Sequence, residues 1–264
     1  MSKYKTYTVE SEKMENELSQ LITVKGIKAH ILDLDGVVTQ TAKVHAQAWK
    51  KMFDAYLEKR SEADGKTYQP LDISTDYRQY IDGIPRYDGV RNFLSSRGIT
   101  LQEGTPDDEL EQETVAGLGN RKNLYFQELL KQDGVQLYPD TIAWLRQQRR
   151  QGAKTAIISA SKNCKAILEA AKIEHLFDAR VDGLEAAKLG LKGKPAPDVF
   201  LRAAHLLQVK PSEAAVFEDA IAGVEAGKAG GFALVVGVDR NGHTSQLVEH
   251  GADLVLHKFP ILNP

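Results

Sequence analysis

Short apolar runs alternate with helical patterns over much of the chain. Five runs, each of four or five mostly apolar residues, have the length of buried strands. They span residues 28–32, 154–158, 214–217, 232–236 and 253–256. Apolar residues at helical spacing lie between or after these runs, at 140–151, 162–171, 197–207, 221–229 and 244–249. Because uninterrupted apolar strands are typically covered on both faces, the pattern predicts an α/β fold with a doubly wound parallel sheet.

The stretch 44–133 interrupts this alternation. It contains helical patterns, at 44–59 and 123–131 among others, and no convincing strand. Two of its segments, 69–74 and 103–113, have the composition of loops, and the second is acidic. The pattern therefore predicts a separate helical region in the middle of the chain.

This change of pattern predicts two domains. Residues 1–43 and 134–264 are expected to form the α/β core domain, and residues 44–133 a helical cap domain inserted into it. Residues 1–25 are an N-terminal extension of the core domain, with a short helix expected near 10–21.

Polar residues stand directly after three of the predicted strands. Asp33 follows the first run, Ser159 the second, and Glu218 with Asp219 the third. In parallel sheets, functional groups gather just past the carboxyl ends of the strands, so we expect these side chains to meet in one site. Asp35 lies two positions after Asp33, so both side chains should project to the same side.

These residue types suit phosphoryl transfer. A carboxylate such as Asp33 can attack a polyanionic phosphoryl group only if a cation screens the repulsion. Glu218 and Asp219 could complete an oxygen-rich shell for Mg²⁺, and Ser159 could donate a hydrogen bond to phosphate. Lys194 lies beside Pro195 and Pro197, which stiffen its segment. Each residue also has an ordinary explanation, as a surface acid, a helix N-cap or a solvated lysine.

Taken together and in this order, the motifs resemble those of the haloacid dehalogenase-like phosphotransferase superfamily. The segment Asp33-Leu34-Asp35-Gly36-Val37 comes first, followed by Ser159, then Lys194, then Glu218-Asp219. The resemblance covers the chain from about Gly26 onward. It implies a Rossmann-like α/β core with an inserted helical cap of the C1 type.

Within the superfamily the chain is most similar to the β-phosphoglucomutase-like branch. The matching segments are Thr39 to Ala42, His45 to Trp49, Gly83 to Arg86, Arg121 to Asn123, Ser159 to Asn163 and Lys194 to Asp198. This resemblance implies transfer of a phosphoryl group on a small phosphorylated sugar, as in the conversion of β-glucose 1-phosphate to glucose 6-phosphate.

The resemblance implies a role for each acidic residue. Asp33 is the nucleophile that becomes phosphorylated, and Asp35 is the general acid and base. Asp33, the backbone carbonyl of Asp35, and Asp219 are implied to hold Mg²⁺, with Glu218 close to the ion.

The resemblance also assigns the residues that bind phosphate and substrate in the core. Ser159 and Lys194 are implied to bind the transferring phosphoryl oxygens and to offset their charge. Ser161 and Asn163 are implied to lie at the edge of the site.

Five further residues, near or in the cap, are candidates for substrate binding. Arg86 and Lys122 are implied to bind the distal phosphate, which does not react. His45 could position Asp35 or the substrate, and Trp49 lies four residues further along the same helical pattern. Thr41 is implied to mark the hinge where the cap closes.

Two activities of the same class stay open at this point. In a mutase, a sugar hydroxyl of a bisphosphate intermediate attacks the aspartyl-phosphate, whereas in a phosphatase water attacks. A second cationic site in the cap, Arg86 with Lys122, favours the mutase. The long cap segment 103–113 and the insertion Leu189 to Lys192 are departures from typical β-phosphoglucomutases, so a sugar-phosphate phosphatase is the alternative.

Other classes fit the sequence less well. Receiver-type signalling domains also use an aspartate, an acidic pair and a lysine, but their acidic pair precedes the phospho-accepting aspartate and they lack a cap. Dehalogenation is disfavoured by Asp35 and by the pair Glu218-Asp219, which indicate magnesium and phosphate. A scaffold protein without activity is the remaining alternative.

The composition of the chain limits the kinds of partner and the cellular location that we expect. The chain has 264 residues and a net charge of -2, which gives no electrostatic footprint for nucleic acid or an anionic membrane. The single cysteine, Cys164, excludes an intrachain disulfide. With neither a signal peptide nor an apolar run of membrane-spanning length, we expect a cytoplasmic protein that is a monomer or a weak homodimer.

Overall fold

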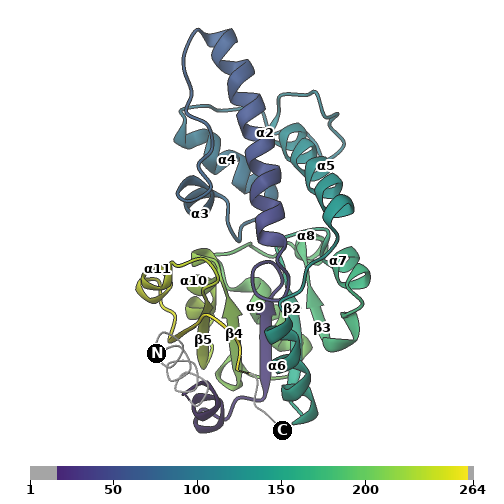
Figure 1. Ribbon diagram of the computed structural model, residues 1–264, viewed down its shortest axis with the longest axis vertical. Helices are drawn as coiled ribbons and strands as arrows, with labels where there is room; N and C mark the ends of the chain where they lie inside the picture. The colour runs from purple at the N-terminus through teal and green to yellow at the C-terminus, as the bar shows by residue number, and fades with distance from the viewer. Residues whose placement is uncertain (1–16, 261–264) are drawn as a thin grey trace, which may run out of the picture. The chain divides into compact units, whose positions relative to one another are not determined.

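The computed structural model describes residues 17–260, and the chain divides into two compact units (Figure 1). The first unit comprises Met1–Gln40 and Gln136–Pro264, and we call it the core unit. The second comprises Thr41–Val135, and we call it the helical unit. The predicted helix near 10–21 lies partly outside the described residues, within which residues 17–24 are helical.

The core unit is built on a six-stranded sheet in which every neighbouring pair is parallel. Its strands are β1 (Ala29–Asp33), β2 (Lys154–Ile158), β3 (Ala179–Val181), β4 (Ala214–Glu218), β5 (Leu234–Val238) and β6 (Leu254–Leu256). They lie in the order β3-β2-β1-β4-β5-β6, so the direction of winding reverses between β1 and β4. This order is that of a doubly wound sheet, which confirms the predicted fold class.

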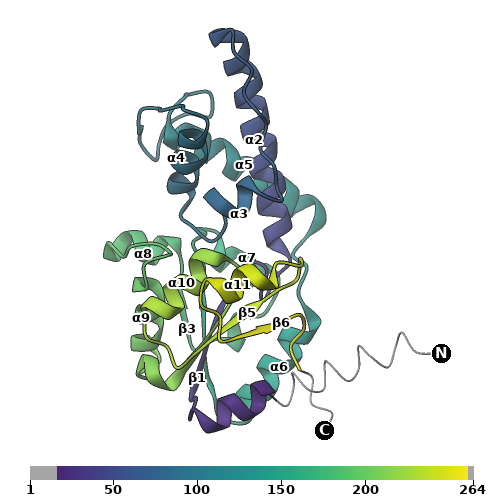
Figure 2. The same cartoon turned by 90° about the vertical axis from the view of Figure 1, so that its left-hand side faces the viewer.

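Helices cover both faces of this sheet (Figure 2). Those of the core unit are α6 (Pro139–Arg150), α7 (Cys164–Ala170), α8 (Gly183–Leu189), α9 (Asp198–Leu206), α10 (Ile221–Ala229) and α11 (Thr244–Glu249), with short 3₁₀ turns at Glu174–Leu176 and Pro211–Glu213. Helices α9 and α10 pack on one face, where Phe200 and Val224 meet β-strand residues such as Ile31. On the other face, Trp144 of α6 packs against Phe217 of β4.

The sequence pattern missed or displaced three elements of the core unit. Strand β3 has only three residues, one of them Arg180, and α8 opens on a glycine, so neither leaves a clear periodic signal. Strand β5 begins two residues later than the apolar run at 232–236. The amide of Ala233 bonds to the carbonyl of Pro211, and ladder pairing with β4 starts only at Leu234.

The helical unit contains α2 (Thr41–Asp64), α3 (Asp76–Tyr80), α4 (Arg86–Ser96) and α5 (Val115–Asp133). Their apolar sides share one core, in which Phe53 of α2 packs against Phe93 of α4. Helix α5 begins at Val115, eight residues before the predicted helical pattern at 123–131. Glycines at 117 and 119 obscure its first turns, because glycine is a poor helix former.

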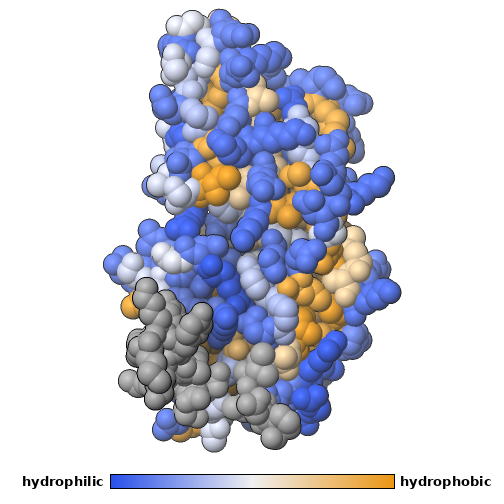
Figure 3. All heavy atoms as spheres, viewed as in Figure 1, coloured by the Kyte–Doolittle hydropathy of each residue, from blue (hydrophilic) through white to orange (hydrophobic). Residues whose placement is uncertain are grey.

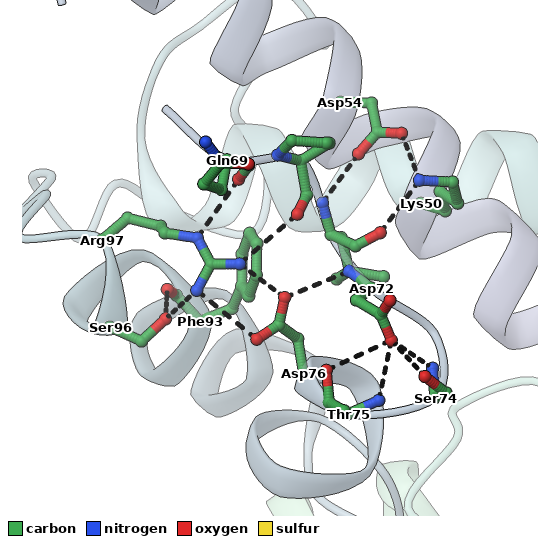
Figure 4. Close-up of polar contacts among 12 residues, drawn as sticks. Lys50, Asp54, Gln69, Asp72, Ser74, Thr75, Asp76, Phe93, Ser96 and Arg97 are labelled. Atoms are coloured by element: carbon green, nitrogen blue, oxygen red, sulfur yellow. Dashed lines mark hydrogen bonds and ion pairs between the residues drawn. The ribbon is translucent and has the colours of Figure 1, made fainter. Parts of the chain in front are cut away.

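Arg97 anchors the loop that precedes α3 to the end of α4 (Figure 4). Arg97, at the end of α4, forms an ion pair with Asp76, and its guanidinium also donates to the carbonyls of Gln69 and Pro70. The same group lies over the ring of Phe93 at 4.5 Å. This loop is therefore fixed to α4 by charge, hydrogen bonds and stacking together.

The acidic segment 103–113 has a defined structure. Asp108 accepts hydrogen bonds from the hydroxyls of Thr105 (2.8 Å) and Thr114 (2.5 Å). Thr114 is also the N-cap of α5, where its side chain accepts from the amide of Gly117. The Asn120 side chain of α5 donates to the carbonyl of Asp108 at 3.0 Å. The segment is thus built onto the first turns of α5.

Exposed apolar side chains are spread over many elements. In the view of Figure 3, hydrophilic residues separate the apolar patches. The large hydrophobic side chains that are exposed among the described residues are Val24, Ile73, Leu124, Leu184, Leu189, Leu201, Leu206 and Val248. Within residues 17–260, we find no helix with the length and hydropathy required to traverse a bilayer.

Candidate active site

The candidate site of the core unit lies at the reversal of the sheet, between β1 and β4. Asp33 is the last residue of β1, and Glu218 is the last residue of β4. Ser159 directly follows β2. In doubly wound sheets, the crevice outside the carboxyl ends of the strands at this reversal is where ligands bind.

Lys194 joins the two strand ends. Its Nζ atom lies 2.5 Å from Oδ1 of Asp33 and also forms a short ion pair with Oε1 of Glu218. All three side chains are buried. A buried ammonium between two carboxylates is charge-compensated, and the loop that carries Lys194 is thereby tied to both strands.

The environment of these groups changes their pKa values. Burial would lower the pKa of Lys194, but the carboxylates of Asp33 and Glu218 outweigh burial and hold it above its ordinary value. Burial raises the pKa of Glu218, and the ammonium of Lys194 opposes that rise. Lys194 therefore remains a cation in the site, available to a second anionic group such as a phosphoryl oxygen.

A chain of hydrogen bonds links Asp35 to the loop after β2. The hydroxyl of Ser159 donates to Oδ2 of Asp35 at 3.2 Å, and the backbone amide of Asp35 donates to Oδ2 of Asp33 at 2.8 Å. The amide of Ser161 donates to the Ser159 hydroxyl, and the amide of Asn163 donates to the Ser161 hydroxyl. The five residues thus lie along one hydrogen-bonded chain at the strand ends.

Asp219 lies against Gly36. A Cβ atom added at Gly36 would collide with the carboxylate of Asp219, so this acid closely approaches the backbone just after Asp33 and Asp35. Gly36 has φ +88, in the left-handed region that favours glycine. The position of the Asp219 carboxylate therefore requires a glycine in the turn after β1.

The donor chemistry of this corner fits Mg²⁺. Asp33, the carbonyl of Asp35 and Asp219 offer oxygen atoms only, which hard cations prefer. Among residues 17–260, no cluster of three or more His, Cys, Asp or Glu side chains could hold a metal. Mg²⁺ usually binds through one or two carboxylates together with water and substrate phosphate, so a site with two carboxylates is sufficient.

The helical unit brings His45, Trp49 and Lys122 together. Nζ of Lys122 lies 2.6 Å from Nδ1 of His45, and it sits 5.0 Å from the ring centroids of Trp49 and Phe126. The rings of His45 and Phe126 stack at 4.0 Å. Because a protonated lysine only donates, Nδ1 accepts and the neutral imidazole carries its proton on Nε2.

Arg86 adds a second cation to the helical unit. Its guanidinium donates to Oδ1 of Asn123 at 2.8 Å, and burial lowers its pKa. Burial, together with the charges of Lys122 and Arg86, holds the pKa of His45 well below its ordinary value. The cluster of His45, Arg86, Lys122 and Asn123 is therefore electropositive, with a neutral histidine. Thr41, the first residue of α2, is buried in the same unit.

Sequence reasoning missed two residues next to the core site. His243 and Asp239 follow β5, and Nε2 of His243 lies 2.9 Å from the backbone carbonyl of Asp219. Asp239 could have been found from the sequence by the same signal as Asp33, because both are polar residues at the end of an apolar run. The shift of β5 toward Val238 placed the predicted strand end two residues too early to draw attention to Asp239.

Comparisons with known proteins identify the family of this chain. The family described as haloacid dehalogenase-like hydrolase matches residues 27–231. The β-phosphoglucomutase of Mycobacterium tuberculosis is 48% identical over 233 residues, which cover 87% of this chain and 89% of that protein. A β-phosphoglucomutase of Bacillus subtilis is 33% identical, over 88% of this chain and 90% of that protein.

Solved structures show the same fold. The crystal structure of β-phosphoglucomutase from Clostridium difficile aligns with a TM-score of 0.69 and 26% identity, over 90% of this chain and 93% of that one. The sheet order, the residues at the strand ends and the extent of the sequence match lead to one assignment. The chain belongs to the haloacid dehalogenase-like hydrolase family of enzymes.

Proposed function

We propose that this enzyme transfers a phosphoryl group on a small phosphorylated sugar through an aspartyl-phosphate on Asp33, as a β-phosphoglucomutase does. The observation that carries the proposal is the buried contact of Lys194 with Asp33 and Glu218, beside Asp35. It combines a carboxylate nucleophile, a fixed cation and a second acid in one place.

The proposed chemistry has two balanced steps. An oxygen of Asp33 attacks phosphorus, the bond from phosphorus to the sugar oxygen breaks, and Asp35 gives its proton to that leaving oxygen. An incoming hydroxyl then loses its proton to Asp35 and attacks the aspartyl-phosphate, which frees Asp33. Lys194 and Ser159 bind the phosphoryl oxygens during both steps, with Ser161 and Asn163 at the edge of the site.

We propose that Asp33, the carbonyl of Asp35, and Asp219 hold Mg²⁺, with Glu218 nearby through its contact with Lys194. When bound, the ion would offset the negative charge shared by carboxylate and phosphate. The residues of the chain supply the nucleophile, the proton transfer and the second cation.

We propose that the helical unit acts as a cap that binds the phosphate that does not react. Arg86 is the main ligand, because its guanidinium can bind phosphate with two donors. Lys122 adds charge and fixes the proton of His45 on Nε2, so His45 can donate a hydrogen bond to substrate. Trp49 and Thr41 complete this group, Thr41 at the first residue of α2.

The same site supports hydrolysis if water replaces the sugar hydroxyl in the second step. The hydrolase description of the matching family favours this second candidate. The two activities differ in their products, so they can be separated directly. We expect glucose 6-phosphate without inorganic phosphate from β-glucose 1-phosphate with a trace of glucose 1,6-bisphosphate. Inorganic phosphate released in step with substrate loss would assign the enzyme as a phosphatase instead.

The role of Asp33 is tested in the same assay. The Asp33→Asn variant keeps the size of the side chain but is a poor nucleophile, so turnover should fall by at least about a thousandfold. Asp64→Asn, an exposed acid at the end of α2, is the control and should retain activity. Equal turnover by wild type and Asp33→Asn, or turnover unaffected by chelation of Mg²⁺, would contradict the proposal.

The role of Arg86 in the helical unit needs its own variant. Replacing Arg86 by Met removes a charge-assisted contact to phosphate, so KM for the bisphosphate should rise about tenfold or more. Arg78→Met, on α3 of the same unit, is the control for loss of one positive charge. If both variants change KM equally, Arg86 has no specific role in binding the distal phosphate.

A further inference from the structure

His243 contacts the acidic pair from a neighbouring loop of the core unit. Its Nε2 atom lies 2.9 Å from the backbone carbonyl oxygen of Asp219, and its side chain is buried. A carbonyl oxygen can only accept a hydrogen bond, so Nε2 carries the proton and donates it. The contact is to the main chain of Asp219 and does not involve the carboxylate of that residue.

Asp239 orients His243. Its Oδ1 atom accepts from the amides of Asn241 (2.9 Å) and Gly242 (2.6 Å), and Oδ2 accepts from the amide of His243 (2.9 Å) and the hydroxyl of Thr244 (2.6 Å). Nδ1 of His243 lies 3.1 Å from Oδ1 of Asp239 but forms no hydrogen bond with it, so Asp239 acts on His243 through the backbone of the loop. Burial would raise the pKa of Asp239, but these hydrogen bonds outweigh it and lower the pKa to about 2. These hydrogen bonds therefore fix the backbone of the loop after β5, which orients the imidazole of His243.

Asp219 is thus confined at two points. Its carboxylate lies against Gly36, and its carbonyl accepts from His243. A ligand that is ordered before the ion arrives does not lose conformational freedom on binding, which strengthens binding. Hydrogen bonds that orient metal ligands in this way commonly change metal affinity by about 10- to 100-fold.

We propose that His243, oriented by Asp239, is a positioning residue that sets the Mg²⁺ affinity of the site by holding the main chain of Asp219. The inference rests on the proposed role of Asp219 as a magnesium ligand. It concerns the strength of metal binding and adds no group to the proposed chemistry.

The test is direct binding of Mn²⁺, measured from the electron paramagnetic resonance signal of the free ion and competed with Mg²⁺. In His243→Leu the donor is lost, and the dissociation constants for both ions should rise by on the order of tenfold. In His243→Gln the amide nitrogen can replace Nε2, and binding should stay within about threefold of wild type. The Mg²⁺ concentration for half-maximal activity should follow the same order, while kcat at saturating Mg²⁺ changes little.

Two controls separate this effect from loss of structure. His250→Leu removes an exposed histidine that follows α11 and should leave Mn²⁺ binding unchanged. If His243→Leu does not fold, His243→Asn, which is too short to reach the carbonyl, is compared with His243→Gln by the same measurement.

The outcomes are distinct. Wild-type affinity in a folded His243→Leu variant overturns the inference, and so does equal weakening in the Gln variant and the Leu or Asn variant. Failure of the wild type itself to bind Mn²⁺ or Mg²⁺ overturns the proposed metal site, and with it the basis of this inference.

Discussion

At position 36 the backbone needs two properties that glycine alone combines. The residue has φ +88, and a Cβ atom there would occupy the space of the Asp219 carboxylate. In Gly36→Ala, Asp219 must move away from the corner that carries Asp33 and Asp35. A displacement of about 1 Å at such a site can reduce turnover a hundredfold, so we expect a loss of at least about that size. Steady-state kinetics at several Mg²⁺ concentrations would measure it.

Gly152→Ala is the matched control for this substitution. Gly152 has φ +90, almost the same conformation, but a Cβ atom there would meet nothing within 4 Å. Both variants carry the same backbone strain, and only Gly36→Ala has the collision. Equal loss of activity in the two would show that strain alone is responsible and that contact with Asp219 is unimportant.

At the scale of single residues, the positions of the candidate residues at strand ends could be predicted from the sequence. Asp33, Ser159 and Glu218 each follow an apolar run. What the pattern could not predict is which of them touch. Lys194 binds Asp33 across 161 positions of sequence, and the contact of His243 with Asp219 spans 24. Such contacts depend on strand order, which local periodicity does not encode.

At the scale of elements, the loop before α3 is held from two helices of the helical unit. On one side, Asp54 of α2 accepts from the amide of Leu71 at 2.9 Å, and Lys50 donates to the carbonyl of Leu71 at 2.9 Å (Figure 4). On the other side lies Arg97 of the α4 terminus. Arg86 of the proposed phosphate-binding cluster comes later in the chain, after α3.

Arg97→Met should loosen this loop. The substitution leaves the half-buried Asp76 carboxylate without its ion-pair partner and frees the carbonyls of Gln69 and Pro70. A hydrogen bond to a charged group contributes about 1.5–3 kcal/mol, so local opening should become about tenfold or more frequent. Hydrogen–deuterium exchange of the amides in residues 69–80 would measure this increase.

Arg91→Met is the control on the same helix. Arg91 pairs with Glu103, but its side chain is 41% exposed, against 16% for Arg97. Exposed ion pairs contribute little, so exchange in residues 69–80 should stay near the wild-type rate. Similar acceleration in both variants would mean that general loss of charge, and not the anchoring of the loop, is responsible.

Several helices of the core unit were predicted to within a residue at each end, whereas the short strand β3 and the first turns of α5 were not. Helices α10 and α11 occupy the predicted ranges 221–229 and 244–249. Helix α5 begins earlier than predicted because the cap at Thr114 and the packing of Gly117 and Gly119 start it. A Cβ atom at Gly119 would collide with Tyr87 of α4, so a glycine there allows the two helices to pack closely. The same glycine weakens the helical pattern in the sequence, which is why the start of α5 was not predicted.

At the scale of the whole molecule, the core unit contains an acid-sensitive group at the centre of its sheet. His30 of β1 is fully buried between Trp144 and Phe217, and its Nε2 donates to Oε1 of Gln148 at 3.1 Å. Its Nδ1 has no hydrogen-bond partner among the described residues. Burial, only partly opposed by the Gln148 contact, lowers the pKa of His30 from 6.5 to about 4.

The sign of the resulting pH dependence follows from linkage. Above pH 6.5 both the folded and the unfolded chain hold His30 neutral, and its contribution to stability is fully present. As pH falls from 6.5 toward 4, His30 becomes protonated in the unfolded chain but stays neutral in the folded core unit. The unfolded state is therefore favoured, and the free energy of unfolding falls. Between pH 7.5 and 5 this loss amounts to about 2 kcal/mol.

His30→Gln should remove this part of the acid sensitivity while keeping a polar group beside Gln148. The free energy of unfolding by urea, measured at pH 7.5 and pH 5, should fall by about 2 kcal/mol less in the variant than in the parent. A Trp49→Phe background leaves Trp144, which packs on His30, as the single tryptophan, so its fluorescence reports on the core unit. His205→Gln, an exposed histidine of α9, should leave the pH dependence unchanged. A pH dependence that is identical in the His30→Gln variant and its parent would show that the buried imidazole is not the acid-sensitive group.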